Sequence, residues 1–171
     1  MDCCNIICYN FKMNICLNKA SIKDSKKIHE MQVISFKPLL EKYSDYDTNP
    51  AAETLKKIEA RFAFDNVDHY LICLCKTTIG YIRIRCFDED ICTTYMLSQM
   101  FITPDYQGEG YAQAAIKQAE LLYPKAKKWI LETIKQEIKL RYIYEKMGYK
   151  QTGAEKRIKD GMDLIYYEKQ P

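Results

Sequence analysis

The chain lacks several features that would assign it to a specialised class of protein. No apolar run of about 18 residues occurs among its 171 residues, so no transmembrane helix is expected. Residues 1–11 contain Asp2 and no basic segment, so they predict no secretory signal. Internal repeats, low-complexity tracts and domain linkers are missing as well. These absences favour one cytoplasmic domain spanning residues 1–171, with residues 1–11 as an N-terminal extension.

Histidine is scarce, and this scarcity argues against a metal site. His29 and His69 are the only two histidines, and they do not supply the second ligand pair that zinc would need beside the cysteines at positions 3, 4 and 8. The eight cysteines stand in a chain that does not resemble a small secreted scaffold. We therefore expect no metal and interpret all eight cysteines as structural. Four of them lie in or beside β-type runs, where a free cysteine acts as a small apolar side chain: Cys73, Cys75, Cys86 and Cys92.

The chain also has little excess charge of either sign. Its 26 Lys and Arg residues against 23 Asp and Glu residues give a net charge of +3. Binding of nucleic acid needs a clustered basic face, and the densest basic run, residues 125–128, is typical of a solvated loop. We expect no nucleic-acid partner. A composition of 47% hydrophobic and 29% charged residues instead indicates an ordinary globular domain with a real core.

Hydrophobic periodicity predicts helices and strands in alternation along the chain. Helices are expected over residues 21–42, 51–64, about 112–122 and 139–146. Strands are expected over 13–17, 69–76, 80–87, 93–102 and 129–134, followed by a hairpin formed by 149–151 and 162–168. The first helix carries an apolar stripe of Ile28, Met31 and Ile34. In the strand over 80–87, Tyr81, Arg83 and Arg85 share one face, and we interpret the two arginines as charges that face solvent.

One stretch combines a strand, a glycine turn and a helix. Gly108 and Gly110 can adopt positive φ without steric cost, and the start of the following helix presents unpaired backbone N–H groups to an anion. We interpret Gln107–Ala112 as a cradle for a pyrophosphate. The face expected to pack the helix against a sheet consists of Ala112, Ala115, Ile116, Ala119 and Leu122.

Two better-known phosphate loops do not fit this stretch. The P-loop spacing of Gly-x-x-x-x-Gly-Lys-Ser/Thr is missing, which argues against hydrolysis of nucleoside triphosphates. The dinucleotide pattern Gly-x-Gly-x-x-Gly fails because Gln113 occupies the position of the third glycine. Dinucleotide redox chemistry therefore loses support too.

The remaining pattern, Gln-x-x-Gly-x-Ala over residues 107–112, resembles the acyl-CoA pyrophosphate motif of the GNAT superfamily of acetyl-CoA-dependent N-acetyltransferases. Residues 102–106 (Ile-Thr-Pro-Asp-Tyr) resemble the lead-in to that motif, and residues 142–149 (Tyr-Ile-Tyr-Glu-Lys-Met-Gly-Tyr) are similar to the family's C-terminal Tyr-Glu-Lys-Leu-Gly-Phe signature. The resemblance covers residues from about 95 to the end. It implies an α/β (α+β) fold: a single GNAT-like domain with a central, mixed, largely antiparallel twisted sheet of about six or seven strands and about four flanking helices.

The resemblance also implies transfer of an acetyl group from acetyl-CoA to a primary amine by direct attack in a ternary complex, without a metal. Coenzyme A would contact backbone groups of Phe101 and Ile102 through its pantetheine arm. Its pyrophosphate would bind the amides of Gln107, Gly108, Glu109, Gly110, Tyr111 and Ala112.

Tyr144 matches the family's tyrosine that protonates the departing thiolate, a role suited to a phenol with a pKa near 10. Tyr142 and Tyr149 are flanking alternatives. Glu137 stands where family members often place Asn, which puts one coenzyme contact or helix cap in doubt. The general base stays unassigned; Glu132 is a carboxylate on the fifth strand whose facing the sequence does not reveal.

The family shapes its acceptor pocket with the loop between the first two helices, so Phe36, Tyr43, Tyr46 and Asp47 are candidates for substrate contact or, alternatively, a packed helix connection. The loop's aromatic residues favour a small-molecule or peptidic amine. Polyamines, amino sugars, aminoglycosides, free amino acids, peptide N-termini and protein lysines all stay open, as does a homodimer. Two other classes compete with an enzyme: a non-catalytic acyl-CoA-binding sensor of the same fold, and a structural or partner-binding domain without a cofactor.

Overall fold

The structure is a computed structural model that describes residues 15–87 and 92–171. The expected N-terminal extension, the start of the first strand at 13–14 and the cysteines at positions 3, 4 and 8 lie outside these residues. Along the described residues, the elements follow the predicted order: β1 (Ile15–Lys19), α1 (Ser25–Tyr43), α2 (Leu55–Arg61), β2 (Val67–Leu74), β3 (Thr77–Cys86), β4 (Thr94–Ile102), α3 (Tyr111–Leu122), β5 (Lys128–Ile134), α4 (Ile138–Lys146), β6 (Lys150–Lys159) and β7 (Met162–Lys169). Single 3-10 turns are η2 (Ile22–Asp24), η3 (Pro50–Ala52) and η4 (Pro104–Tyr106).

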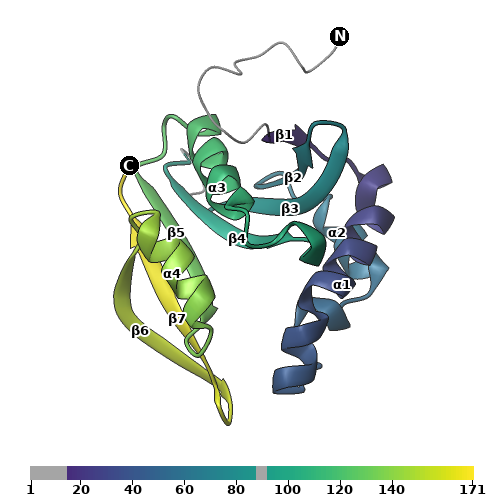
Figure 1. Ribbon diagram of the computed structural model, residues 1–171. Helices are drawn as coiled ribbons and strands as arrows, with labels where there is room; N and C mark the ends of the chain where they lie inside the picture. Colours follow the sequence, from purple (N-terminus) through teal and green to yellow (C-terminus); the bar gives the residue numbers. More distant parts are fainter. Residues whose placement is uncertain (1–14, 88–91) are drawn as a thin grey trace.

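The strands form one seven-stranded sheet in the order β1-β2-β3-β4-β5-β7-β6. All neighbouring strands are antiparallel except β4 and β5. This parallel pair is short: it joins Thr94, Tyr95 and Met96 to Lys128, Trp129 and Ile130, and beyond these residues the two strands no longer pair. The expected fold is confirmed, and the sheet consists of a β1–β4 half and a β5–β7 half that join only at one end of β4 and β5 (Figure 1).

The two faces of the sheet bury different side chains. α3 and α4 cover a large apolar cluster that includes Ile72, Ile82 and Trp129. α1 and α2 cover the other face, where a smaller cluster contains Ile28, Ile58 and Phe101 (Figure 1). Strand residues alternate between the two clusters because successive side chains of a strand point to opposite faces.

The helix faces differ in detail from the pattern expected from spacing. On α3, Ala114 is buried and Leu122 is 48% exposed, so the prediction for Leu122 was wrong. On α1, Ile34 is 58% exposed, while the polar Gln32 is fully buried. The predicted stripe on α1 is therefore confirmed for Ile28 and Met31, which pack against the sheet, and was wrong for Ile34, because the polar Gln32 lies on the buried side.

The closing hairpin is longer than predicted. β6 extends to Lys159 and pairs with β7 next to a two-residue connection, Asp160-Gly161, in which Gly161 has φ = 75°. Asp-Gly between two strands is the sequence signal for such a turn. The Asp160-Gly161 dipeptide therefore marks the turn and the end of β6. The spacing of apolar residues did not reveal the full length of the hairpin.

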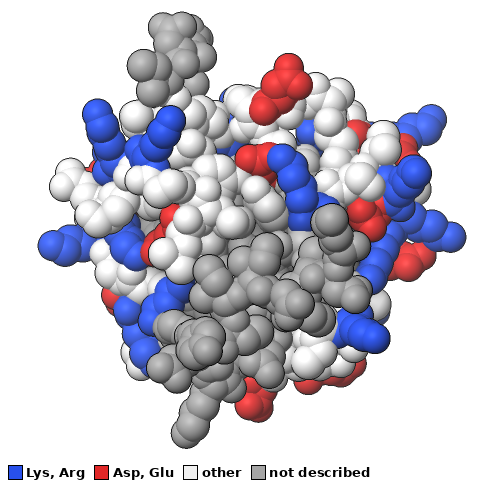
Figure 2. Space-filling model, turned by 90° about the horizontal axis from the view of Figure 1, so that it is seen from above, with Lys and Arg blue, Asp and Glu red and all other residues white. Residues whose placement is uncertain are grey.

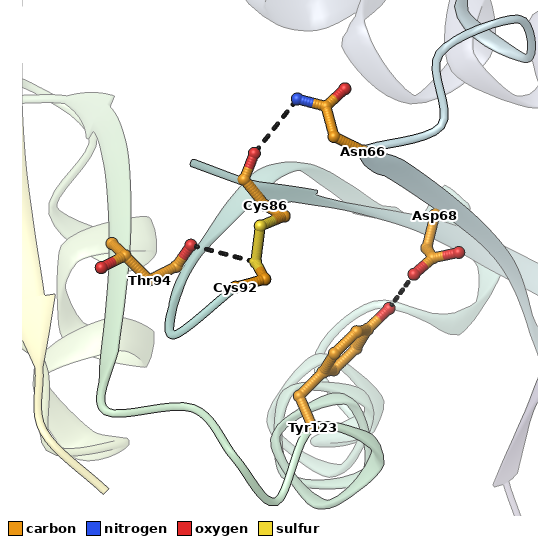
Figure 3. The surroundings of a disulfide bond; sticks show 6 residues. All are labelled: Asn66, Asp68, Cys86, Cys92, Thr94 and Tyr123. Carbon is orange, nitrogen blue, oxygen red and sulfur yellow. Dashed lines mark hydrogen bonds between the residues drawn. A yellow bond between two sulfur atoms is a disulfide. The ribbon is translucent and has the colours of Figure 1, made fainter. Parts of the chain in front are cut away.

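Two cysteines that were expected to be free form a disulfide. Cys86 at the end of β3 and Cys92 just before β4 are bridged, with their Cα atoms 5.8 Å apart (Figure 3). Antiparallel pairing of β3 with β4 brings their ends together, which places the two side chains within bridging distance. The carbonyl oxygen of Cys86 also accepts a hydrogen bond from Asn66. Of the other described cysteines, Cys73 is buried as expected, whereas Cys75 is exposed.

Charges of both signs are distributed over the described surface. In the view from above, Lys and Arg side chains are interspersed with Asp and Glu around the uncoloured residues (Figure 2). Among the helices in the described part of the chain, none combines the length and the apolar character needed to cross a membrane.

Candidate active site

The predicted cradle lies between the end of β4 and the start of α3. Gly108 has φ = 87° and Gly110 has φ = 82°, a region that other residues rarely adopt. Gly110 is the N-cap of α3, and no side chain caps the helix there. The first turn of α3 therefore presents backbone N–H groups without intrahelical partners at the positive end of the helix dipole.

The turn before α3 is held by contacts that leave these N–H groups open. The Gln107 side-chain amide donates a hydrogen bond to the carbonyl oxygen of Ile102 at 2.8 Å. Thr103 N donates to Ile79 O at 2.8 Å, which ties the end of β4 to β3. A Cβ atom built at Gly108 would meet nothing within 4 Å. The space beside the turn is thus open to an anion such as a diphosphate, and the predicted residues fit it.

β4 offers an unpaired edge next to the cradle. From Leu97 to Ile102 the strand pairs with β3 only, because β5 has diverged. The divergence coincides with a β-bulge: Ile84 is paired with Leu97 and Arg83 with Gln99, so that Ser98 is the extra residue. Backbone groups of an unpaired strand edge can bind an extended ligand. The carbonyl oxygen of Ile102 is already occupied by Gln107.

Tyr144 lies on α4, in the other half of the domain. Its ring packs edge-on against Tyr149, with the ring centroids 6.2 Å apart, and beside Tyr167 at 6.3 Å. Burial raises the pKa of Tyr144 to about 12. Of the flanking alternatives, Tyr142 is 59% exposed, while Tyr149 is buried and donates a hydrogen bond to Glu120 at 3.0 Å. Among the described residues, no hydrogen-bond partner is found for the Tyr144 hydroxyl, which leaves it available to a ligand.

Glu137 connects the start of α4 to the end of α1. Its carboxylate accepts hydrogen bonds from Lys42 Nζ and from the Tyr43 hydroxyl, both at 2.6 Å. Burial alone would raise the pKa of Glu137, but these two donors outweigh it and lower the pKa. In addition, Lys159 near the hairpin turn donates to the carbonyl oxygen of Ser44 at 3.1 Å. The loop after α1 is thereby tied to both α4 and the β6–β7 hairpin.

The four candidate acceptor residues lie in different surroundings. Phe36 is half-buried and packs edge-on against Phe101, with ring centroids 5.7 Å apart. Tyr43 binds Glu137, as described above. Tyr46 is 70% exposed and Asp47 is exposed as well, in a loop organised by the Asp45 carboxylate, which accepts the backbone N–H of Asp47 and of Thr48. The structure therefore brings Phe36 against β4 and directs Tyr46 to solvent.

Polar residues beneath α1 and α2 were missed by the sequence reasoning. Arg83 does not face solvent as predicted: its Nε donates to Ser98 Oγ at 2.9 Å, its Nη1 is enclosed, and burial lowers its pKa. The prediction was wrong because α1 and α2 cover this face of β3. Arg85, two residues further on, is exposed as predicted.

The same face holds further buried polar groups that no apolar pattern could reveal. Glu53 accepts a hydrogen bond from Arg61 Nη1 at 2.7 Å, and Arg61 Nη2 also pairs with it. His69 is 3% exposed and contacts the Tyr81 hydroxyl at 2.6 Å through Nδ1. Burial lowers the pKa of His69 to about 4 and raises that of Tyr81 to about 12. Alternation in β3 had placed Tyr81 and Arg83 together, which was the one available signal.

Two remaining expectations concern carboxylates and metals. Glu132 on β5 is exposed and has no role assigned by its surroundings. Within residues 15–87 and 92–171, no three His, Cys, Asp or Glu side chains are grouped so that they could hold a metal ion.

Comparisons with known proteins concern the domain as a whole. A family model described as an acetyltransferase (GNAT) domain matches residues 40–171. Searching curated protein sequences yields no match. One similar solved structure is an acetyltransferase from Thermus thermophilus, with 16% identity and a TM-score of 0.72 over 93% of this chain and 98% of that one. A second is RimL, a ribosomal L7/L12 alpha-N-protein acetyltransferase in complex with coenzyme A, with 13% identity and a TM-score of 0.72 over 91% of this chain and 93% of that one. A third is a spermidine N-acetyltransferase SpeG chimera from Vibrio cholerae and hSSAT, with 18% identity and a TM-score of 0.71 over 91% of this chain and 95% of that one. At these identities the likeness shows the fold.

Proposed function

Because this chain belongs to the GNAT acetyltransferase family, we propose that it transfers the acetyl group of acetyl-CoA to a primary amine by direct attack in a ternary complex. The observation that carries the proposal is the pairing of an open N–H cradle at Gly108–Ala112 with an unpaired edge of β4. Coenzyme A has a diphosphate, which matches the cradle, and an extended pantetheine arm, which matches the edge of β4.

The chain's own residues would hold the coenzyme by main-chain contacts. The N–H groups from Gly108 to Ala112 would bind the diphosphate, and the helix dipole favours its charge. The N–H of Gln107, which was predicted to take part, instead donates to Pro104 O at 3.2 Å. Backbone groups of Phe101 and Ile102 bind the pantetheine arm, with the Ile102 carbonyl available only if Gln107 releases it. Acetyl-CoA, when bound, supplies the electrophilic thioester.

Tyr144 is the proposed proton donor to the departing thiolate. Burial raises its pKa to about 12, which keeps the phenol protonated over the whole neutral range, so the proton is present when the thiolate forms. The same shift makes the phenol a weaker acid. The tyrosine belongs to the β5–β7 half, whereas the cradle belongs to the β1–β4 half. A coenzyme lying along the β4 edge would therefore meet donors from both halves.

The acceptor would bind beside α1 and the loop after it, where Phe36 and Tyr43 are candidate contacts. Tyr46 and Asp47 face solvent and would contact only a part of the acceptor that extends out of the site. Solved relatives named for spermidine and for a ribosomal protein N-terminus show that one fold serves different amines. A small-molecule or peptidic amine is favoured because hydrogen bonds from Glu137 and Lys159 join the end of α1 to α4 and to the β6–β7 hairpin.

Coenzyme binding is tested by thermal unfolding with coenzyme A. A ligand at 100 times its dissociation constant stabilises the folded state by about 2.7 kcal/mol. Gly110→Trp should abolish the shift because the indole fills the cradle. Gly153→Trp is the matched control: Gly153 also has positive φ, at 86°, but lies on β6 with nothing within 4 Å of an added Cβ.

Chemistry is tested by thiol release from acetyl-CoA with a panel of amines. Tyr144→Phe should lower kcat by about 10²-fold or more, the range of a lost general acid, with coenzyme binding unchanged. Tyr142→Phe serves as the control on the exposed side of α4. Coenzyme binding without turnover of any amine would instead indicate a non-catalytic acyl-CoA-binding module, and an absence of coenzyme binding would contradict the proposal altogether.

A further inference from the structure

A chain of buried hydrogen bonds beneath α1 ends in an acceptor atom without a partner. Gln32 Nε2 on α1 donates to Glu53 Oε2 at 3.0 Å and to Pro50 O at 2.7 Å. Because the Glu53 carboxylate only accepts, the Gln32 amide is oriented with Oε1 toward β4. Gln99 Nε2 donates to that Oε1 at 2.7 Å. The Gln99 amide is therefore oriented as well, and its Oε1 is enclosed without a partner among the described residues.

A donor without a partner lies on the neighbouring strand. Arg83 is the cross-strand partner of Gln99, and the two side chains lie on the same face of the sheet. The Nη1 of Arg83 is enclosed and bonds to no other described residue. Ser35 Oγ, one helical turn after Gln32, is a third enclosed atom of this kind. Native proteins rarely leave such groups unsatisfied, so each one calls for an explanation.

The charge on this face is also unbalanced. Glu53 is paired with Arg61 and neutralises it, and the carboxylate carries a lowered pKa because the hydrogen bonds from Arg61 and Gln32 outweigh its burial. His69, buried, is neutral above pH of about 4. Arg83 donates to Ser98 Oγ and also interacts with the Tyr81 hydroxyl. Among the described residues no carboxylate is hydrogen-bonded to Arg83, although the nearby charge of Glu53 acts to raise its pKa. A guanidinium stays charged inside a protein, so this one attracts an anion.

Arg83 also lies at the point where the sheet opens. Ser98, the bulged residue of β4, accepts from Arg83 Nε and donates to Arg83 O at 3.1 Å. The bulge closely follows Met96, the last residue of β4 that pairs with β5. A ligand held by Arg83 and Gln99 would thus lie over β4 where its edge becomes free, beside the proposed path of the thioester.

Resting on the proposed acetyl transfer, we propose that the acceptor is an amino carboxylate, a small amine with a carboxylate one or two carbons away. Its carboxylate binds Arg83 Nη1, and its neutral amine donates one N–H to Gln99 Oε1. A short separation is proposed because Arg83 and Gln99 are cross-strand partners on one face of the sheet, so that one small molecule can reach both side chains. Gln99 lies beneath α1, where it bonds to Gln32, and both orphaned atoms are enclosed. The proposal therefore requires the side chains that cover them to move when the acceptor binds.

The reaction of this acceptor is balanced without any further reactant. The amine nitrogen forms a bond to the acetyl carbon, and the bond from that carbon to sulfur breaks. The nitrogen loses one proton, and the thiolate gains one. The product is an N-acetyl amino carboxylate, whose carboxylate keeps the same partner.

The test uses matched acceptors with the full chain. Each set consists of an amino acid, its carboxamide and the decarboxylated amine. The first set is alanine, alaninamide and ethylamine, and the second is lysine, lysinamide and cadaverine. β-Alanine and spermidine are tested in addition. Thiol release gives kcat/KM, and we expect the amino acid to exceed its carboxamide and its amine by about 10- to 100-fold, the value of a charge-assisted hydrogen bond. Arg83→Gln should remove this ratio and preserve the thermal shift by coenzyme A.

The matched control is Arg85→Gln, which removes an exposed arginine from the same strand. It should leave the ratio unchanged. A binding measurement accompanies turnover: with coenzyme A present, thermal shifts by the twenty protein amino acids and β-alanine are compared between the wild type and Arg83→Gln. We expect at least one amino acid to stabilise the wild type and not the variant.

The outcomes separate this inference from the proposed function. Equal use of amino acids, carboxamides and decarboxylated amines, or a ratio that Arg83→Gln leaves intact, overturns the amino-carboxylate acceptor while acetyl transfer stands. The same holds if Arg83→Gln changes only the free energy of unfolding, the result expected when a buried water links Arg83 to Gln99. No stabilisation by any amino acid likewise overturns it. A wild type that does not bind coenzyme A overturns the proposed function first.

Discussion

The two faces of the sheet differ in what they bury. Under α3 and α4 the buried residues are almost all apolar, and they include Ile116, Leu131 and Trp129. Under α1 and α2 the apolar cluster is small, and it adjoins buried polar residues such as Gln32 and His69. The face under α3 and α4, here called the apolar face, supports the cradle, a candidate site made of backbone groups. The face under α1 and α2, here called the mixed face, supports a candidate site made of side chains. We infer that the first holds a common coenzyme and the second selects the acceptor.

This division has a physical reason. A backbone N–H site depends on the positions of main-chain atoms, which apolar packing holds without specifying any side-chain partner. A site made of charged and amide side chains needs each group to be oriented by its neighbours, and burial makes any unpaired group costly. The following predictions test the contrast, from the largest expected effect to the smallest.

The apolar face should respond most strongly to lost volume. Ile116 on α3 is completely buried, so Ile116→Ala should lower the free energy of unfolding by about 4 kcal/mol, the range of large-to-small core changes. Urea unfolding followed by circular dichroism measures it. Leu122→Ala on the same helix is the control and should have a small effect, since Leu122 is 48% exposed. Equal effects of the two variants would contradict the assigned packing face.

The mixed face should respond to lost charge pairing. Glu53→Gln leaves the guanidinium of Arg61 without its carboxylate, beside Arg83, and should lower the free energy of unfolding by about 3 kcal/mol, as when one partner of a buried ion pair is removed. Urea titrations at neutral pH measure the change. Glu41→Gln, on the exposed side of α1, is the control. An unchanged free energy of unfolding in Glu53→Gln would contradict the view that charge pairing stabilises this face.

The mixed face should also make stability depend on pH. The pKa of His69 falls from 6.5 to about 4 because the ring is buried, so between these pH values the unfolded chain binds a proton that the folded chain does not. The free energy of unfolding should therefore decrease by about 2 kcal/mol as pH falls from 7 to 5. His69→Gln should flatten this slope, measured by urea unfolding at each pH. An unchanged slope would show that His69 is not the titrating group.

The cradle should depend least on any one side chain. Gln107→Ala removes the hydrogen bond to Ile102 O and should lower the free energy of unfolding by about 1 kcal/mol, the value of one neutral hydrogen bond, whereas coenzyme affinity, which depends on backbone groups, should change little. Calorimetric titration with coenzyme A and urea unfolding measure the two quantities. Gln170→Ala, at an exposed position, is the control. Complete loss of binding in Gln107→Ala would show that the side chain, rather than the backbone, makes the cradle.

Prediction from sequence succeeded where structure is local. The order of helices and strands, the turn at Gly108 and Gly110, and the start of α3 all follow from residues that are neighbours in the chain. It failed for Arg83, because an alternating strand looks the same whether solvent or a helix covers its polar face. The disulfide between Cys86 and Cys92 was missed since strand pairing, rather than local propensity, brings the two cysteines together.

By itself, the amino-acid sequence determined the cradle, because positive φ at glycine and the free N–H groups of a helix start are properties of adjacent residues. Tertiary structure alone decided the mixed face. Gln32 and Gln99 are 67 residues apart, and their hydrogen bond exists only because α1 packs over β4 at this register. Side-chain partners between distant segments depend on register and helix packing together, and neither can be read from the spacing of residues within one segment.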